Sequence, residues 1–393
     1  MSELDFLEKL LDGAQVQWKP LGEIAEYSTE RISAEKLDPS TYVGVDNLLQ
    51  NRAGRIDSNY VPNSGNLTRF EEGDILIGNI RPYLRKIWLS DRTGGTNGDV
   101  LVIHPTDDVL SSRYLFQVLT DERFFEYNIQ HSKGAKMPRG SKPQILQFLV
   151  PIPCPEKPEK SLAIQGEIVR ILDSFTELTA ELTAELELRK KQYNHYRDQL
   201  LTFADGKVEW MALGELTRIK TGQSVNKRMI ADNPGEYPVI NSGREPLGFI
   251  DAWNTEDDPI GITSRGAGVG SVTWQEGRYY RGNLNYSVTI KSADVLSVAY
   301  LYHVLEQFQP QVKALCTFDG IPALNAVNLK KLSIPLPPLK EQTWIATILE
   351  TFDTLTTSLS EGLPREIELR EKQYEYYRDL LLSFPKPAEA AEA

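Results

Sequence analysis

The chain is built from one unit used twice, and this internal repeat constrains its fold more than any other feature of the sequence. The segment Val16–Ile24 (VQWKPLGEI) returns as Val208–Leu216 (VEWMALGEL). Further matched pairs follow in the same order: Ile80–Arg81 with Ser264–Arg265, Tyr114–Leu119 with Tyr300–Leu305, Met137–Pro138 with Ile321–Pro322, Val150–Pro153 with Ile334–Pro337, Gln165–Phe175 with Gln342–Phe352, and Lys191–Asp198 with Lys372–Asp379. A chain of 393 residues with this repeat predicts two equivalent domains, each with its own core.

Each copy opens with a block of mixed secondary structure. Short strand-like runs such as Ile75–Ile77 and Tyr286–Ile290 are separated by turns rich in Gly and Asn. The patterns predict one helix over 112–127 in the first copy and one over 298–308 in the second. A proline-rich strand end closes each block, because proline stops regular structure.

Beyond these prolines the hydrophobic spacing becomes that of a coiled coil. It predicts a continuous helix over 161–203, roughly 60 Å long, and a second helix that Glu361–Pro364 interrupts with a C-cap glycine and a restart. The expected seam residues are Ile168, Ile171, Phe175, Leu178, Leu182, Leu186, Ile345, Ile348, Phe352, Leu355 and Leu359.

The first of these helices contains the tetrapeptide TAEL twice in tandem, at Thr179–Leu182 and Thr183–Leu186. Four residues make about one helical turn, roughly 6 Å of rise. Each copy is therefore expected to act as a length adjuster. The second step of four that ends at Leu186 is also a stutter, which locally unwinds a supercoil.

The predicted fold class is α+β, with two similar mixed α/β domains separated by two long antiparallel coiled-coil helices in a circular, pseudo-two-fold repeat. The repeat is circular because Leu10-Leu11 before Trp18 resembles Leu200-Leu201 before Trp210. The expected segments are an N-terminal helix packing near the C-terminal helix (1–13), the first block (14–155), a helical spacer (156–206), the second block (207–338), a C-terminal helical region (339–385) and a disordered tail (386–393).

The net charge of −12 argues at first against a nucleic-acid partner, but the charge is unevenly distributed. The block from Ala14 to Pro155 has 16 basic and 17 acidic residues, and the block from Lys207 to Pro338 has 13 of each. Local basic patches can persist in such neutral blocks, and local potential attracts phosphate. Two cysteines in unrelated contexts and the lack of a long apolar run predict a cytoplasmic protein.

Motifs of catalysis are missing from the sequence. There is no P-loop, the four histidines lack metal-ligand spacing, and the adenine-methyltransferase signature is absent. We therefore expect no catalytic residue, no cofactor-binding residue and no metal site in this chain.

Binding chemistry is present instead. The run from Lys133 to Lys142 has four positive charges and no acid. Lysine neutralises phosphate, arginine can bridge guanine, and asparagine can read adenine. The candidate DNA-binding residues are Arg81, Arg85, Lys86, Lys133, Lys136, Arg139, Lys142, Lys227, Arg228, Arg265, Arg278, Arg281 and Asn283. Each of these also suits an ordinary solvated surface, and the repeat of Arg81 as Arg265 favours a shared function.

These motifs resemble the specificity subunit of type I restriction-modification systems over essentially the whole chain. The carriers are the L-G-E-[IL] entry of each block (Leu21–Ile24 in the first), the I-P-x-P-P-x-x-E-Q exit (Ile334–Gln342) and the R-x-K-Q-Y-x-Y-Y-R-D-x-L helix (Arg370–Leu381). The TAEL tandem and Glu361–Arg370 resemble the IC subclass.

The resemblance implies a non-catalytic protein whose two target-recognition domains each bind half of a bipartite, asymmetric double-stranded DNA site. It implies that the helices set the spacing and dock two modification subunits of an adenine-N6 methyltransferase, with restriction subunits joining in the full complex. S-adenosylmethionine, ATP and Mg²⁺ would then be bound by the partners. From the residues themselves, two other readings stay open: a protein-only scaffold with twin ligand-binding domains, and a self-contained DNA enzyme.

Overall fold

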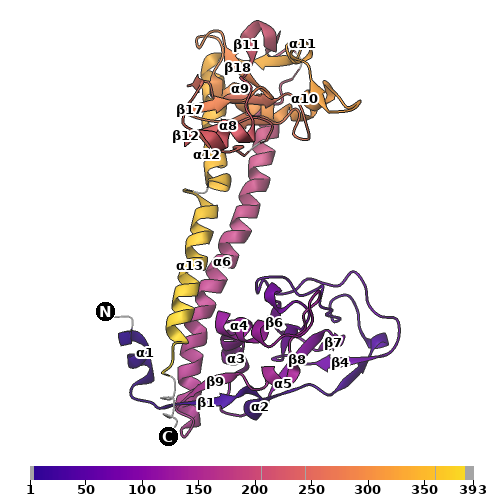
Figure 1. Ribbon diagram of the computed structural model, residues 1–393, viewed down its shortest axis with the longest axis vertical. Helices are drawn as coiled ribbons and strands as arrows, with labels where there is room; N and C mark the ends of the chain where they lie inside the picture. The colour runs from indigo at the N-terminus through magenta and orange to yellow at the C-terminus, as the bar shows by residue number, and fades with distance from the viewer. Residues whose placement is uncertain (1–3, 205, 244, 359, 386–393) are drawn as a thin grey trace. The chain divides into compact units, whose positions relative to one another are not determined.

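The computed structural model describes residues 4–204, 206–243, 245–358 and 360–385 (Figure 1). They fall into two compact units, one formed by Met1–Glu181 with Ile367–Ala393 and the other by Leu182–Glu366. The longest helix, α6 (Pro158–Leu200), contributes residues to both. The tail predicted over 386–393 and the expected seam residue Leu359 lie outside the described residues.

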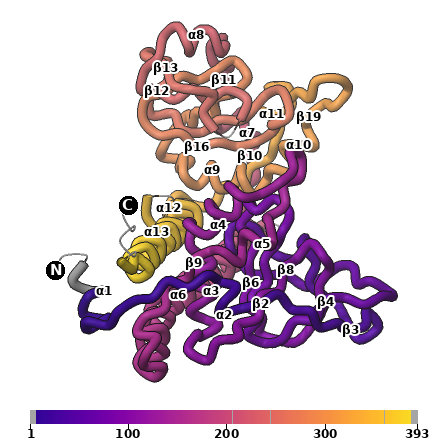
Figure 2. The backbone as a smooth tube through the Cα atoms, turned by 60° about the horizontal axis from the view of Figure 1, so that its bottom comes forward, coloured from indigo at the N-terminus to yellow at the C-terminus, as the bar shows by residue number. Residues whose placement is uncertain are grey.

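The block of the first unit is built from short strands and helices. Its elements are β1 (Val16–Pro20), α2 (Leu21–Ile24), β2 (Ala25–Tyr27), β3 (Arg31–Ser33), η1 (Ala34–Lys36), β4 (Asn66–Phe70), β5 (Ile75–Gly78), η2 (Pro82–Leu84), β6 (Ile87–Leu89), β7 (Gly94–Thr96), β8 (Val100–Pro105), α3 (Ser112–Leu119), α4 (Glu122–Gln130), α5 (Lys142–Ile145) and β9 (Leu149–Pro153). The strands form antiparallel sheets in the orders β2-β8-β5-β6, β3-β4-β7 and β1-β9. In both views β4 lies on the side of this block away from α6, and Figure 2 shows β3 beside it (Figures 1 and 2).

The second unit repeats this plan with more strands. Its block contains β10 (Glu209–Ala212), α7 (Leu213–Leu216), β11 (Thr217–Thr221), α8 (Lys227–Asp232), β12 (Pro234–Ile240), β13 (Phe249–Ile250), β14 (Thr255–Glu256), β15 (Ile260–Thr263), β16 (Val272–Trp274), β17 (Arg278–Arg281), β18 (Asn285–Ile290), α9 (Val298–Gln307), α10 (Gln309–Ala314), β19 (Cys316–Thr317), β20 (Ala323–Leu324), α11 (Ala326–Leu329) and β21 (Ser333–Leu336). The sheet orders are β11-β18-β15-β16, β13-β12-β17-β14, β10-β21 and β19-β20.

The two blocks share strand pairing down to single residues. The first strand of each pairs antiparallel with the proline-rich closing strand, and Trp18 faces Pro151 in β1-β9 as Trp210 faces Pro335 in β10-β21. The four-stranded sheets β2-β8-β5-β6 and β11-β18-β15-β16 likewise correspond. The duplicated α+β fold predicted from the sequence repeat is confirmed.

A buried helix follows the sheet in each block and ties it to the closing strand. The hydroxyl of Tyr114 (α3) donates to the carbonyl oxygen of Pro151 at 2.8 Å, and that of Tyr300 (α9) donates to Pro335 at 3.0 Å. Both tyrosines are fully buried, so these bonds satisfy phenols that burial would otherwise penalise. The helix predicted over 112–127 is wrong in one respect: it breaks into α3 and α4, because the Asp121 side chain accepts from Arg123 N and caps a new helix.

A buried glutamine fixes each long helix to its block. Gln165 of α6 accepts from the backbone N–H of Ser111 at 2.8 Å and donates to the carbonyl oxygen of Val109 at 2.6 Å. Gln342 of α12 (Leu339–Thr357) makes the same bonds with Ser297 and Val295, both at 2.9 Å. Neither glutamine is exposed to solvent. The matched bonds show that α6 on α3 and α12 on α9 are equivalent contacts.

The helical region beyond α12 continues as α13 (Leu363–Leu381), beside α6 (Figure 1). The predicted interruption is present, but its predicted C-cap glycine is wrong. α12 ends at Thr357 with Ser358 as its C-cap, and Gly362, with φ of +85°, lies directly before α13. In the first unit Phe175 of α6 stacks on Tyr377 of α13 with ring centroids 5.1 Å apart. In the second unit Tyr196 of α6 stacks on Phe352 of α12 at 5.5 Å. Within the first unit, residue numbers rise along α6 in the direction in which they fall along α13, so these two helices run antiparallel (Figure 1).

The expected seam is only partly buried. Ile168 and Ile345 are buried, whereas the half-buried seam residues are Ile171, Phe175, Leu178, Leu182, Leu186, Ile348, Phe352 and Leu355. Leu172 and Leu349, which the heptad count leaves out, are fully buried. Near their starts α6 and α12 pack on a whole block, whose surface is wider than that of a single helix, so more faces of the helix are covered there.

The first and last segments that the structure describes share the core of the first unit. Leu7 and Leu11 of α1 (Leu4–Leu11) share that core with Leu381, Leu382 and Phe384. The indole of Trp18 donates to the carbonyl oxygen of Pro385 at 2.9 Å. The residues that follow α13 thus lie beside β1, where the second unit has a covalent link from α6 to β10.

Replacing Gln342 with Leu should destabilise the protein by about 2–3 kcal/mol, because a buried N–H and a buried carbonyl lose their partner. Urea unfolding followed by circular dichroism measures this. The control is Glu341→Gln, an exposed neighbour on the same helix, which should change stability by less than about 0.5 kcal/mol. Equal stability of the two variants would show that the amide does not hold the helix.

Candidate nucleic-acid interface

In the first unit, two candidate segments far apart in the sequence form one surface. The backbone N–H of Arg81 donates to the carbonyl oxygen of Pro138 at 2.7 Å, and Ile80 forms a β-bridge with Arg139. Lys133 and Arg139 exchange backbone hydrogen bonds at 2.9 Å in both directions, so the basic run is a closed hairpin-like loop. The loop after β5 and the basic run are therefore held together by backbone contacts.

Arg81 has an unusual backbone conformation. It begins the short helix η2 with φ of +52°, and Arg85 ends that helix with φ of +50°. Positive φ is uncommon for residues other than glycine and costs free energy, so such residues concentrate at functional sites. The side chain of Arg81 is exposed. The strained turn fixes where this guanidinium leaves the surface.

The second unit builds a corresponding pair of loops, in which the backbone contact is shifted by one residue relative to the arginine. The backbone N–H of Gly266 donates to the carbonyl oxygen of Pro322 at 2.9 Å, and Arg265 forms a β-bridge with Ala323. Arg265 is exposed like Arg81. The matched pairs of the sequence repeat, an arginine after the central strand and an apolar-proline dipeptide, are thus brought into contact in each unit.

Each loop pair also presents an apolar side chain that charge-based reasoning missed. Met137 is 45% exposed and its counterpart Ile321 is 70% exposed. Exposed apolar side chains beside cations suit contact with thymine methyl groups and base edges. The signal was present in the sequence, because Met137–Pro138 aligns with Ile321–Pro322.

The remaining cations of the first unit are divided between free and internally bound groups. Among the described residues, Arg81, Lys133 and Lys136 have no carboxylate within ion-pair distance, and the exposed Lys142 lies over the ring of Tyr27. Three candidates are engaged within the protein. Arg139 pairs with Asp99 at 3.2 Å, Arg85 pairs with Glu122, and Lys86 donates to the carbonyl oxygen of Val45 at 2.7 Å.

The second unit carries its candidate cations in two places. Lys227 and Arg228 open α8 and are exposed, Arg228 by 91% of its side chain, with Asp232 one turn away at 3.5 Å. Arg278 lies over the ring of Trp253 at 4.7 Å and pairs with Glu256 at 2.7 Å. Asn283 is exposed in the turn between β17 and β18.

Arg281 requires a correction, because the structure places it in the core and not on the surface. Its side chain is 3% exposed and donates to the carbonyl oxygens of Asp258, Ile260 and Tyr286. It also donates to Asn285 Oδ1 at 2.6 Å and to the Tyr279 hydroxyl. Burial lowers the pKa of this guanidinium from its ordinary value. Arg281 therefore ties β15, β17 and β18 together and is not available to DNA.

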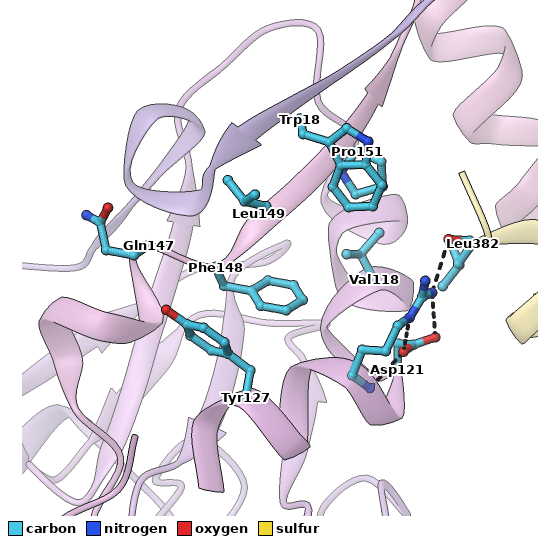
Figure 3. Close-up of a pocket in the computed structure, with 10 residues that line it drawn as sticks. Trp18, Val118, Asp121, Tyr127, Gln147, Phe148, Leu149, Pro151 and Leu382 are labelled. Carbon is cyan, nitrogen blue, oxygen red and sulfur yellow. Dashed lines mark hydrogen bonds and ion pairs between the residues drawn. The ribbon is translucent and has the colours of Figure 1, made fainter. Parts of the chain in front are cut away.

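A cavity of about 470 Å³ lies in the first unit apart from these loops (Figure 3). Trp18, Phe148 and Leu149 give it apolar walls. Arg123 on one side pairs with Asp121 at 2.7 Å and donates to the carbonyl oxygen of Leu382 at 3.1 Å. The cavity thus offers apolar contact, and the charge of the Arg123 guanidinium at its side is already neutralised by Asp121. Within the described part of the chain, no group of three or more His, Cys, Asp or Glu side chains could hold a metal ion.

Two equivalent blocks, each presenting an arginine-bearing loop pair, define a duplicated binding protein. Residues 15–188 and 206–369 each match the family model of the type I restriction modification DNA specificity domain. The chain belongs to this family. It is thus a DNA-specificity subunit of a type I restriction-modification system and not an enzyme by itself.

Some curated relatives match nearly end to end. The EcoR124I/EcoR124II specificity subunit of Escherichia coli is 37% identical, with 98% of this chain and 99% of the relative covered. A putative type I specificity subunit of Haemophilus influenzae is 32% identical over 96% and 98%. Among solved structures, the S subunit from M. genitalium has a TM-score of 0.63 at 16% identity, covering 95% of this chain and 98% of that one, which shows the fold alone. No helix in the described residues is long and apolar enough to span a membrane.

Replacing Arg281 with Met should lower stability by about 3 kcal/mol or more, because it leaves several buried acceptors without a donor. Arg278→Met, three residues away and exposed, is the matched control and should cost less than about 1 kcal/mol. Chemical denaturation measures both. A stable Arg281→Met protein that bound DNA more weakly would instead place this arginine at the DNA interface.

Proposed function

We propose that each block is a target-recognition domain that binds one half of a bipartite, asymmetric double-stranded DNA site through its paired loops. The supporting observation is the repeated contact that sets Arg81 beside Met137–Pro138 and Arg265 beside Ile321–Pro322. Lysine and arginine on these loops neutralise phosphates, and the side chains at the tips meet base edges. The exposed Lys227, Arg228 and Asn283 extend the surface of the second block.

Family membership implies DNA and assembly with the other subunits of a restriction-modification complex. We propose further that α6, α12 and α13 dock two modification subunits with adenine-N6 methyltransferase activity, and that restriction subunits complete the assembly. S-adenosylmethionine, ATP and Mg²⁺ are then bound by those partners, in the cytoplasm. The TAEL tandem supports assignment to the IC subclass.

Replacing Lys133, Lys136 and Arg139 with Ala should weaken DNA binding and reduce its salt dependence. Each lost phosphate contact lowers the slope of log K against log salt by about 0.9. Fluorescence anisotropy of the assembled complex at several salt concentrations measures the slope. The matched control replaces Lys190 and Lys191, exposed cations of α6, and should leave the slope unchanged. An unchanged slope in the loop variant would remove this loop from the interface.

Inserting a third TAEL should lengthen α6, an uninterrupted helix of 43 residues, by about 6 Å. The spacer between the two half-sites should then grow by about one or two base pairs, at 3.4 Å each. Mapping methylated adenines across a genome that carries the variant and its partners measures the spacer. Thr183→Ala, which keeps the length, is the control. An unchanged spacer in the insertion variant would refute the idea that the length of α6 sets the distance between the half-sites.

A further inference from the structure

The first unit closes an acidic site between two helices with its own arginine. Asp173 of α6 accepts from Arg113 Nη2 of α3 at 2.6 Å. Gln117 of α3 donates through Nε2 to the other oxygen of Asp173 at 2.9 Å and accepts from the Tyr374 hydroxyl at 3.0 Å. Every member of this site thus has a partner within the unit.

The equivalent site of the second unit lacks that cation. The matched bonds of Gln165 and Gln342 fix the correspondence of the helices, so Glu350 of α12 stands where Asp173 stands. Ala299 of α9 takes the place of Arg113, and His303 takes the place of Gln117. A methyl group cannot neutralise a carboxylate. Among the described residues, neither Glu350 nor the nearby Asp353 has a Lys, Arg or His nitrogen within 4 Å.

A cavity of about 450 Å³ occupies this place, and it lies entirely within the second unit. It is lined by Trp274, Glu276, Tyr302, His303, Glu350, Asp353 and Thr354. Glu350 is exposed and Asp353 is half-buried. Partial burial raises the pKa of both carboxyls, and the charge of Glu276 raises that of Glu350 further. Burial also raises the pKa of Asp173 in the first unit, but there the charge of Arg113 opposes the rise, whereas the second unit has Ala299 in place of that arginine.

The buried ring of His303 is a second, independent observation at this cavity. It is 2% exposed, lines the cavity, and neither ring nitrogen has a hydrogen-bond partner among the described residues. Burial, and next the charge of Arg197, lower the pKa of His303 to about 4, so the ring is neutral near pH 7 and one nitrogen is a free acceptor. A buried polar group without a partner is costly, and an entering donor would relieve that cost.

We infer that this cavity receives the guanidinium or ammonium group of an arginine or lysine side chain of a partner protein. Glu350 and Asp353 supply the negative charge, Trp274 and Tyr302 supply aromatic rings that attract cations, and His303 supplies an acceptor. The occupant is assigned by charge complementarity and by the first unit, where a guanidinium fills the equivalent place. The inference rests on the proposed function, because α12 is one of the helices proposed to dock the modification subunits. The exposed Trp344 of α12 is the kind of side chain that protein interfaces bury.

Two variants test the site from opposite directions. Glu350→Gln removes the acid, and Ala299→Arg supplies from within the arginine that the first unit already has. Each should weaken binding of the modification subunit encoded with this chain by about tenfold, measured by isothermal titration calorimetry. Ala299→Arg should leave the melting temperature unchanged or raised. The control, Glu236→Gln, removes an exposed charge of β12 that lies outside the cavity and off the proposed docking helices, and it should bind as wild type.

Wild-type affinity in both Glu350→Gln and Ala299→Arg would overturn the inference. A wild-type chain that did not bind the modification subunit at all would refute the proposed docking function instead. Titration with ethylguanidinium, followed by indole fluorescence, then tests whether the cavity binds a cation independently of the modification subunit. A saturable change in the wild type that is lost in both variants supports the cation site, and no saturable change in the wild type overturns it.

Discussion

The buried glutamine at the start of each long helix is the contact on which the arrangement of each unit depends. Gln165 and Gln342 each satisfy one backbone N–H and one carbonyl oxygen of the segment before α3 or α9. Because these groups are shielded from water, the helix cannot rotate or slide without leaving them unpaired. The rotation fixed here decides which face of the helix meets the block and which faces remain for other contacts.

The duplicated frame lets the two surfaces differ while their supports stay the same. The loop pairs are joined by backbone hydrogen bonds, which do not depend on the side chains. These bonds bring Arg81 near Met137 in one unit and, with the contact shifted by one residue, Arg265 near Ile321 in the other. This separation of roles suits a protein that determines DNA specificity, because side chains read the bases while the backbone contacts position the loops. Where α3 packs on α6 and α9 packs on α12, the side chains also differ while the backbone contacts stay the same, because Ala299 replaces Arg113.

The candidate site was partly readable from the sequence. The alignment of Arg81 with Arg265 identified the loops that come together, because an internal repeat reports equivalent positions without any structure. Charge alone could not predict that Arg278 is exposed and Arg281 is buried, although the two lie only three positions apart in the sequence. One stacks on an exposed tryptophan, and the other is enclosed by carbonyl oxygens and an amide of neighbouring strands. Their neighbours come from segments distant in the sequence, so composition and local pattern contain no record of them.

The sequence by itself determined the duplication, the two helical regions, the interruption between α12 and α13 and the place of the TAEL tandem within one helix, because periodicity and turn residues are local properties of the chain. Only the tertiary structure decided that Leu172 and Leu349 are buried, that α3 and α4 are separate helices, and that Leu382 completes the core of the first unit. Burial is set by whatever else packs nearby. For these residues the neighbours come from a block or a terminus far along the chain.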